Sequence, residues 1–187
     1  VYSVTPTSGT CVGQAFNLTV TVGPKATIPA QTATICSGEA FSVTLTNNPP
    51  TTVLPTGTTY TWTVADNPSV TGQSAQSTAQ TSISQTLTNN TNEVQEVIYT
   101  VTPKSGNCTG DDFTVTVTVN PKPVVPTQNQ TICSENAFTL NLVNNPTTTI
   151  IPDNTTYTWT VGGTPSVTGQ ADQVTGTGSI SQTLTNI

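Results

Sequence analysis

A period of 97 residues is the feature that most constrains this chain. When the 187-residue sequence is shifted by 97 positions, residues 1–90 align without a gap on residues 98–187, with 53 identities. Two copies this similar indicate a tandem array of one module. A 97-residue unit is far too long for a solenoid repeat and has the size of a small β-sandwich domain. The period therefore predicts serial domains, each with a core of its own.

Proline-rich segments indicate where one module ends and the next begins. The segment Asn120-Pro121-Lys122-Pro123 is matched one period earlier by Gly23-Pro24-Lys25. Proline cannot donate to a strand ladder and stiffens an extended linker, so these segments are typical of joints between domains. We therefore predict that residues 1–22 are the C-terminal strands of a preceding repeat. Residues 23–120 would then form one complete β-sandwich repeat, and residues 121–187 the N-terminal part of the following one.

Four runs inside this unit carry strand signals: residues 41–45, 60–64, 97–101 and 113–119. In the last run apolar and polar residues alternate, which places Phe113 and the valines on one face and the threonines on the other. Clusters of Asn, Pro and Gly separate the runs, and no 3.6-residue period is sustained anywhere. The sequence predicts an all-β fold of antiparallel two-sheet sandwiches of about 97 residues. An alternative frame with a boundary at residue 97 would cut the third run.

The composition excludes several classes of protein. Charged residues make up 6% of the chain, against about 25% in ordinary domains, and the net charge is −6. Phosphate contacts need Lys or Arg, and Lys25, Lys104 and Lys122 are too few and too scattered to bind nucleic acid. A membrane span needs about 20 consecutive apolar residues, and no such run is present. The first residues, Val1 to Thr5, already carry a strand pattern and no signal peptide, so we expect the chain to be cut from a longer protein.

Two cysteines recur in each module, one near the first strand and one in the last hairpin. If the domain runs from residue 23 to 120, we predict a Cys36–Cys108 disulfide, with Cys11 and Cys133 pairing outside the chain. Under the other frame the pairs would be Cys11–Cys36 and Cys108–Cys133, and loop-closure energies do not separate the two schemes. Free buried thiols are a third possibility. A zinc site would need four nitrogen or sulfur ligands, and the chain has no His and no closely spaced Cys pair.

Catalytic chemistry finds no support in the sequence, and we predict that the protein is not an enzyme and carries no cofactor. General acid–base work needs His or tuned carboxylates, and His is absent. Seven of the nine acidic residues have a partner position in the other copy, and none of those positions is acidic. Asp111 and Asp112 are a candidate half of a calcium site, because Ca²⁺ prefers several oxygen ligands. Gln14-Ala15 at the matching place favours a solvated turn.

An aromatic strand recurs in both copies and allows two interpretations. Tyr60 and Trp62 are matched by Tyr157 and Trp159. An exposed Tyr/Trp pair would form a platform on which a sugar stacks. Alternation, however, puts both aromatic side chains on one face with threonines on the other, which is typical of a core strand. We therefore predict that these four residues lie in the core.

The motifs together resemble a known repeat class. They are Thr-Ile-Cys-Ser, then Thr-Tyr-Thr-Trp-Thr-Val, then Tyr-Thr-Val-Thr-Pro-Lys-Ser-Gly-Asn-Cys-Thr-Gly, and last Phe-Thr-Val-Thr-Val-Thr-Val-Asn-Pro-Lys-Pro. In this order and spacing they resemble the PKD-like repeats of Bacteroidota surface proteins, in particular giant gliding-motility adhesins of the SprB type. The resemblance implies an Ig-like or PKD-like sandwich, type IX secretion, display at the extracellular cell surface and a role in gliding motility. After Trp62 the chain has Thr-Val-Ala-Asp where the PKD pattern has Asp-Phe-Gly-Asp-Gly.

Three hypotheses follow for the function. The first is a structural and adhesive stalk repeat of a large cell-surface adhesin, a filament whose partners are neighbouring repeats and an extracellular surface or polysaccharide. The second is a carbohydrate-binding module that uses its loops or the Tyr/Trp strand. The third is self-assembly through edge strands, because Thr-rich, charge-poor edges carry little that opposes strand pairing.

Overall fold

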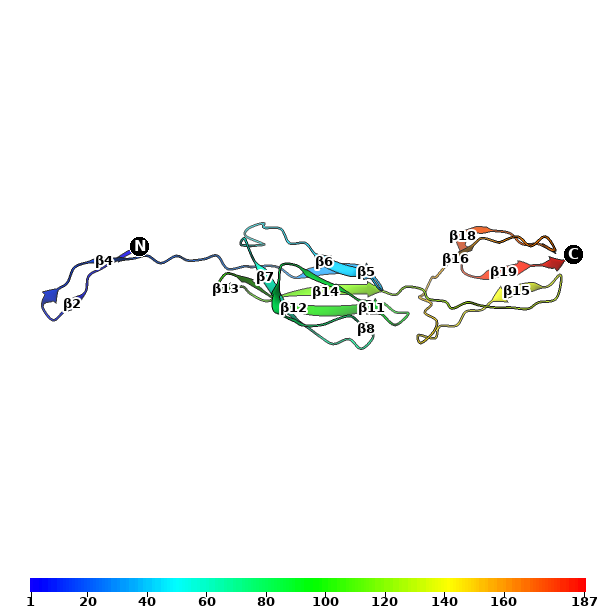
Figure 1. Cartoon of the computed structure of the whole chain (residues 1–187), viewed down its shortest axis with the longest axis horizontal. Coiled ribbons are helices and arrows are strands. Elements are labelled where there is room, and N and C mark those ends of the chain that lie inside the picture. Colours follow the sequence, from blue (N-terminus) through cyan, green and yellow to red (C-terminus); the bar gives the residue numbers. More distant parts are fainter.

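The structure is a computed structural model that describes all of residues 1–187, and every regular element in it is a β-strand. The strands gather in three bodies along the long axis of the molecule: an N-terminal hairpin, a central sandwich and a C-terminal group (Figure 1). None of its elements is a helix long and apolar enough to span a bilayer. The prediction of an all-β, Ig-like sandwich fold is confirmed.

The larger layer of the central sandwich is a six-stranded sheet. Its strand order is β5-β14-β12-β7-β9, and the short strand β13 extends the β12 hairpin. Its members are β5 (Gln31–Cys36), β7 (Thr59–Val64), β9 (Gln76–Gln80), β12 (Gln95–Ser105), β13 (Cys108–Thr109) and β14 (Phe113–Asn120). β12 and β14 are the longest strands and lie in the middle of the sheet. Both are rich in β-branched residues, which pack well on a pleated surface.

The second layer consists of two short antiparallel pairs. β6 pairs with β10, and β8 pairs with β11. Their bounds are β6 (Ala40–Val43), β8 (Val70–Thr71), β10 (Ile83–Thr86) and β11 (Thr88–Asn89). A backbone hydrogen bond links the two layers. The amide of Gly38, in the turn after β5, donates to the carbonyl of Leu87, between β10 and β11, at 2.8 Å.

The core lies between these layers and is formed by 15 buried residues from both of them. From the large sheet, Val97, Tyr99, Val115 and Val117 are all fully buried, and Phe41 of β6 packs its ring 5.3 Å from that of Tyr99. Each fully buried side chain of this size contributes about 1.5–3 kcal/mol. The predicted alternation of β14 is therefore the pattern that builds the core.

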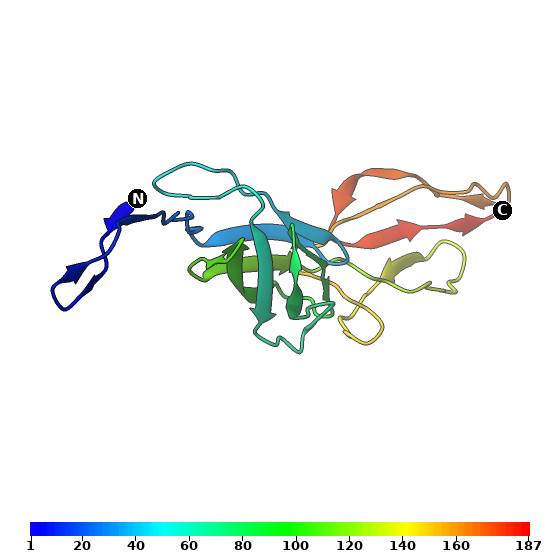
Figure 2. The ribbon, with the colours of Figure 1, turned by 60° about the vertical axis from the view of Figure 1, so that its left-hand side comes forward.

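One strand pair departs from the predicted antiparallel arrangement. β5 runs parallel to β14, with six register pairs from Gln31↔Val115 to Cys36↔Asn120. The first and last strands of the domain are therefore neighbours that point the same way. Figure 2 shows the consequence: the chain enters the sandwich at one end and leaves it at the other.

The N-terminal hairpin repeats part of the central sheet. It contains β1 (Tyr2–Val4), β2 (Thr7–Ser8), β3 (Cys11–Val12) and β4 (Phe16–Leu18). The β1–β4 pair Tyr2↔Leu18 lies one period before the β12–β14 pair Tyr99↔Val115, so the same register occurs in both copies. None of its residues is buried.

The C-terminal group repeats the other part of the sandwich. Its strands are β15 (Ala137–Leu140), β16 (Tyr157–Trp159), β17 (Val167–Thr168), β18 (Gln173–Thr177), β19 (Ile180–Thr183) and β20 (Thr185–Asn186). The β15–β19 pair copies β6–β10, and the β17–β20 pair copies β8–β11. Residues 128–133, one period after β5, form no strand. β5 pairs only with β14, and the counterpart of β14 would fall after residue 187.

Candidate functional site at the two ends of the sandwich

The N-terminal end of the central sandwich is where the incoming chain docks. Ala26 is fully buried, and its carbonyl lies against Gly110, where a Cβ would come within 2.6 Å of the Ala26 oxygen. Only glycine allows this close approach of two backbones. The Gly110 amide donates to the carbonyl of Pro103 at 2.8 Å, which closes the β12–β13 hairpin over the linker. The incoming chain is therefore packed against the domain rather than hinged freely from it.

An ion pair and a thiol flank this contact. Lys25 Nζ donates to Asp111 Oδ1 at 2.5 Å, with both side chains more than half exposed. Such an exposed pair contributes little to stability. Cys108 lies with its Sγ 3.9 Å from the carbonyl oxygen of Gly23, and a Cβ at Gly23 would be 3.2 Å from that sulfur. The hairpin thus contacts the linker through a half-buried cysteine side chain.

The C-terminal end is held by a buried polar network around Asn89. Its side-chain amide donates to the carbonyls of Val119 at 2.9 Å and Glu93 at 2.7 Å, and its Oδ1 accepts from the amide of Thr91 at 2.9 Å. The Ser37 hydroxyl donates to the carbonyl of Asn89 and accepts from its amide. These bonds join β11, the end of β14 and the turn after β5 at the C-terminal end of the sandwich.

The predicted Cys36–Cys108 disulfide does not form in this fold, in which all four cysteines are free. Cys36 ends β5 beside Asn120, the last residue of β14. Cys108 lies in the hairpin that precedes the first residue of β14. The length of β14, about 23 Å at 3.3 Å per residue, separates the two ends, and a disulfide needs Cα atoms within about 7 Å. The prediction treated the first and last strands as if those two ends met.

The other pairs considered from the sequence are also separated. Cys11 lies in the N-terminal hairpin and Cys133 in the C-terminal group, and Figure 1 shows these bodies on either side of the central sandwich. Neither Cys11–Cys36 nor Cys108–Cys133 brings two sulfur atoms together.

The two candidate calcium ligands bond to different partners. The carboxylate of Asp111 accepts from Lys25, and Asp112 Oδ1 accepts from the hydroxyl of Thr102 at 2.6 Å. No group of three or more Asp, Glu, His or Cys side chains comes together anywhere in residues 1–187. The arrangement does not assemble the several oxygen ligands that Ca²⁺ requires.

The aromatic strand faces the core in the complete copy. Tyr60 and Trp62 are 5% and 6% exposed, and the Trp62 indole donates to the carbonyl of Ser74 at 3.0 Å. Burial raises the pKa of the Tyr60 hydroxyl. Tyr157 and Trp159 occupy the matching strand β16 and are half-buried, and the Trp159 indole makes the same bond to the carbonyl of Ala171. The Tyr/Trp version of the carbohydrate-binding hypothesis is wrong for the central domain, because a stacking platform must be exposed.

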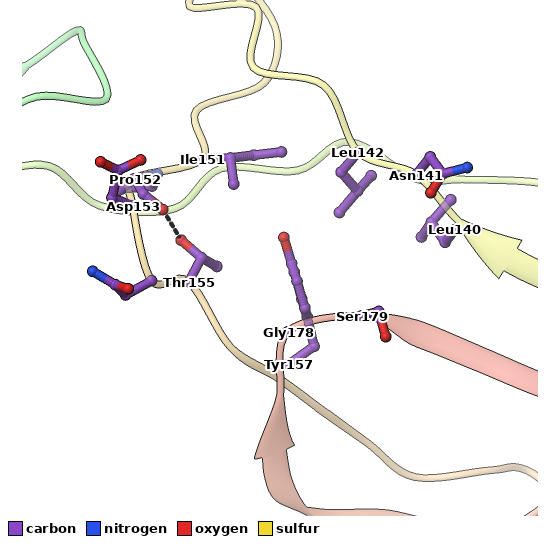
Figure 3. Close-up of a pocket in the computed structure, with 11 residues that line it drawn as sticks. Leu140, Asn141, Leu142, Ile151, Pro152, Asp153, Thr155, Tyr157, Gly178 and Ser179 are labelled. Carbon is purple, nitrogen blue, oxygen red and sulfur yellow. Dashed lines mark hydrogen bonds between the residues drawn. The ribbon is translucent and has the colours of Figure 1, made fainter.

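A cavity of about 370 Å³ opens in the C-terminal group, lined by Leu140, Leu142, Ile151 and Tyr157 among others. Figure 3 shows the Tyr157 ring pointing toward the side chains of Ile151 and Leu142. One period earlier, Val43, Leu45, Leu54 and Tyr60 occupy these positions and pack in or against the core. The cavity therefore corresponds to space that is filled core in the central domain.

The comparison with protein families agrees with this description of the fold. No curated protein matches the chain. Residues 33–123 match the family described as PKD-like domain, which extends from the middle of β5 to just past β14. PKD-like domains are generally extracellular, non-catalytic modules with structural or adhesive roles. The match therefore supports a PKD-like repeat at the centre of this chain.

Proposed function

We propose that residues 23–120 are one repeat of the load-bearing stalk of a large cell-surface adhesin, with residues 1–22 and 121–187 belonging to the neighbouring repeats. The PKD-like match and the resemblance to SprB-like repeats support an extracellular role. The repeated strand register of the N-terminal hairpin and the repeated pairs of the C-terminal group support the tandem frame. The absence of His and of repeated carboxylates supports a mechanical rather than a catalytic task.

The observation that carries this proposal is the parallel β5–β14 pair. Tension on the chain pulls β5 toward the N-terminal end and β14 toward the C-terminal end. The two strands are joined over six register pairs, so their hydrogen bonds lie across the line of pull and share the load. Separation requires that these bonds break together, whereas a hairpin pulled at its open end would lose them one at a time.

Single-molecule pulling tests the mechanical role. With the 187-residue chain held at its termini, we expect one dominant unfolding event that releases about 300 Å, the extended length of a 97-residue domain less its folded length. The same chain pulled between the N-terminus and Asn107 in the β12–β13 turn loads both points at one end of the domain, so β5 is peeled. A clearly lower force in that second geometry is expected. Equal forces in the two geometries would contradict the load-bearing role.

The proposal also includes type IX export and a role in gliding, and both must be tested in intact cells. Antibodies against the chain should label intact cells of the source organism, and loss of type IX secretion should abolish the labelling. Deletion of the parent gene should reduce surface attachment and gliding. Labelling only after permeabilisation would contradict display at the cell surface.

The hypothesis that the loops bind carbohydrate is tested by a separate binding experiment. The full chain is applied to a broad panel of polysaccharides, and saturable binding to one class would assign adhesion to these repeats. Sedimentation of the chain at rising concentration tests self-assembly through the edge strands β5 and β9. A stable extended monomer without glycan binding is what a spacer role predicts.

A further inference from the structure

The two cysteines of each repeat lie at opposite ends of the sandwich, and each end faces a neighbouring repeat. We infer that adjacent repeats are joined by a disulfide, from the cysteine that ends the first strand of one repeat to the hairpin cysteine of the next. In this chain those two positions are Cys36 and Cys108. The inference rests on the tandem arrangement of the proposed function and goes beyond it, since it adds a covalent bond at every joint.

The first step is the place of Cys36 at the C-terminal end. It is exposed, and its register partner is Asn120, the residue with which the domain ends. The amide of Ser37 donates to the carbonyl of Asn120 at 2.9 Å, which fixes the two strand ends side by side. Register partners on neighbouring strands project their side chains on the same face of a sheet. The Cys36 thiol therefore extends beside position 120 at the start of the next linker.

The second step uses the period. Gly23 lies 97 residues before Asn120, so at the joint with the preceding repeat it occupies the position that Asn120 occupies at the next joint. In that repeat, the counterpart of Cys36 would be the register partner of Gly23, one strand spacing or about 4.8 Å away. Its side chain would lie on the same face as a Cβ on Gly23.

The third step is the contact that Cys108 makes. Its Sγ lies 3.2 Å from the position of a Cβ on Gly23, and 3.9 Å from the Gly23 carbonyl oxygen. The Cys108 thiol therefore touches Gly23, which is the expected register partner of the preceding repeat's cysteine. The contact lies on the face of the sheet toward which that cysteine would project. A disulfide needs Cα atoms about 4.4–6.8 Å apart, so the inference requires the Cα of Cys108 to lie within that range of the preceding repeat's cysteine.

This pairing scheme explains why no two cysteines of the chain meet. Cys108 would bond to a cysteine one repeat earlier, and Cys36 to the hairpin cysteine one repeat later. Cys11 and Cys133 are the counterparts of Cys108 and Cys36, and they would reach the repeats beyond. Each of the four has its partner in a repeat outside residues 1–187, so all four are free in the structure.

Formation of the bond follows ordinary thiol–disulfide exchange. One cysteine thiolate attacks the disulfide of an extracytoplasmic dithiol–disulfide oxidoreductase and forms a mixed disulfide. The second cysteine thiolate displaces the enzyme sulfur and closes the bond between the repeats. Two S–H bonds and the S–S bond of the oxidoreductase are broken, and the two electrons and two protons end on its reduced dithiol. The cross-link would limit bending at the joint beside the Ala26–Gly110 contact.

Peptide mapping of the native protein tests the inference. The parent protein is taken from the cell surface with free thiols alkylated, then cleaved after lysine and before aspartate, which puts Cys36, Cys108 and Cys133 on separate peptides. The repeats differ in sequence, so each peptide has its own mass. We expect the Cys108 peptide linked to a first-strand peptide of the preceding repeat. Alkylated Cys108 or a peptide linking Cys36 to Cys108 would overturn the inference.

Two serine variants of the native array provide the matched control. If the bonds join repeats, Cys36→Ser frees one hairpin thiol in the next repeat, and Cys108→Ser frees one first-strand thiol in the preceding repeat. If the bonds lay within repeats, each variant would free the other cysteine of the same repeat. These thiol patterns test the disulfide alone, whereas the pulling experiment tests the load-bearing role. Failure of the disulfide inference can therefore be told apart from failure of the proposed function.

Discussion

At the scale of single residues, Asn89 has the most demanding position in the central domain. It is 2% exposed, and its side-chain amide donates to the backbone carbonyls of Val119 and Glu93, the first in a buried and the second in a partly buried setting. A buried carbonyl without a donor costs about 1–3 kcal/mol. The residue therefore secures the C-terminal end of the sandwich through satisfied polar groups rather than through apolar contact.

Substitution of this side chain should be costly. We expect Asn89→Ala to lower the free energy of unfolding of the full chain by about 2–4 kcal/mol, because it leaves the carbonyls of Val119 and Glu93 without their donor. Urea denaturation monitored by far-UV circular dichroism measures the change. Asn90→Ala is the matched control, since that side chain is exposed and should shift stability by less than about 0.5 kcal/mol. Equal losses in both variants would contradict the network.

Tyr99 should make stability depend on alkaline pH. Burial raises the pKa of its hydroxyl to about 12, and the hydroxyl donates to Gln85 Oε1 at 2.9 Å. Above pH 10 the unfolded chain loses the tyrosine proton while the folded chain keeps it, so the unfolded state binds fewer protons and stability falls. The full contribution is present below pH 10 and is lost between pH 10 and 12, about 2–3 kcal/mol in all. Denaturation at pH 9–12 should show this slope, and Tyr99→Phe should remove most of it.

At the scale of elements, the β5–β14 pair can be weakened at one bond. The Ser37 amide donates to Asn120, and donors toward one partner alternate along a strand, so the Ala33 amide also points to β14. β5 is an edge strand, so the Thr34 amide points away from the sheet. We expect Ala33→Pro to lower the force needed to unfold the domain, because it removes a bond that lies across the pull. Thr34→Pro should lower it much less. If Thr34→Pro lowered the unfolding force more than Ala33→Pro, the β5–β14 hydrogen bonds would not be the bonds that carry the load.

The elements also show what the sequence could and could not predict. β6, β7, β12 and β14 overlap the four runs predicted from the sequence, because each strand's own residues carry the pattern that packs it. β5 was not identified as a neighbour of β14, since its pairing depends on a strand more than 70 residues away. The disulfide prediction failed for the same reason. Spacing places Cys36 near the first strand and Cys108 near the last, but only strand direction decides whether their ends meet.

At the scale of the whole molecule, the three bodies show that one sequence pattern forms different structures depending on the strands beside it. Residues 31–36 and 128–133 both contain the segment Thr-Ile-Cys, yet only the first forms a strand. Trp62 is buried and Trp159 is half-buried, although both indoles make the same hydrogen bond. The difference follows the presence of β12 and β14, which supply seven of the 15 buried core residues. A repeat is therefore a cooperative unit whose first strand depends on its last.

Completion of the C-terminal group should restore this unit. We expect that adding residues 91–120 after Ile187, in a Trp62→Phe background, buries Trp159, because the added segment supplies the counterparts of β12 and β14. Trp159 emission should shift to the blue and lose most of its sensitivity to a soluble quencher. In a matched control, the added copies of Val115 and Val117 are replaced by Ser, which removes apolar contacts worth about 1.5–3 kcal/mol each and should leave Trp159 accessible. If Trp159 responds equally in both chains, the cooperative unit is not the 97-residue repeat, and the frame behind the stalk and the inter-repeat disulfide must be moved.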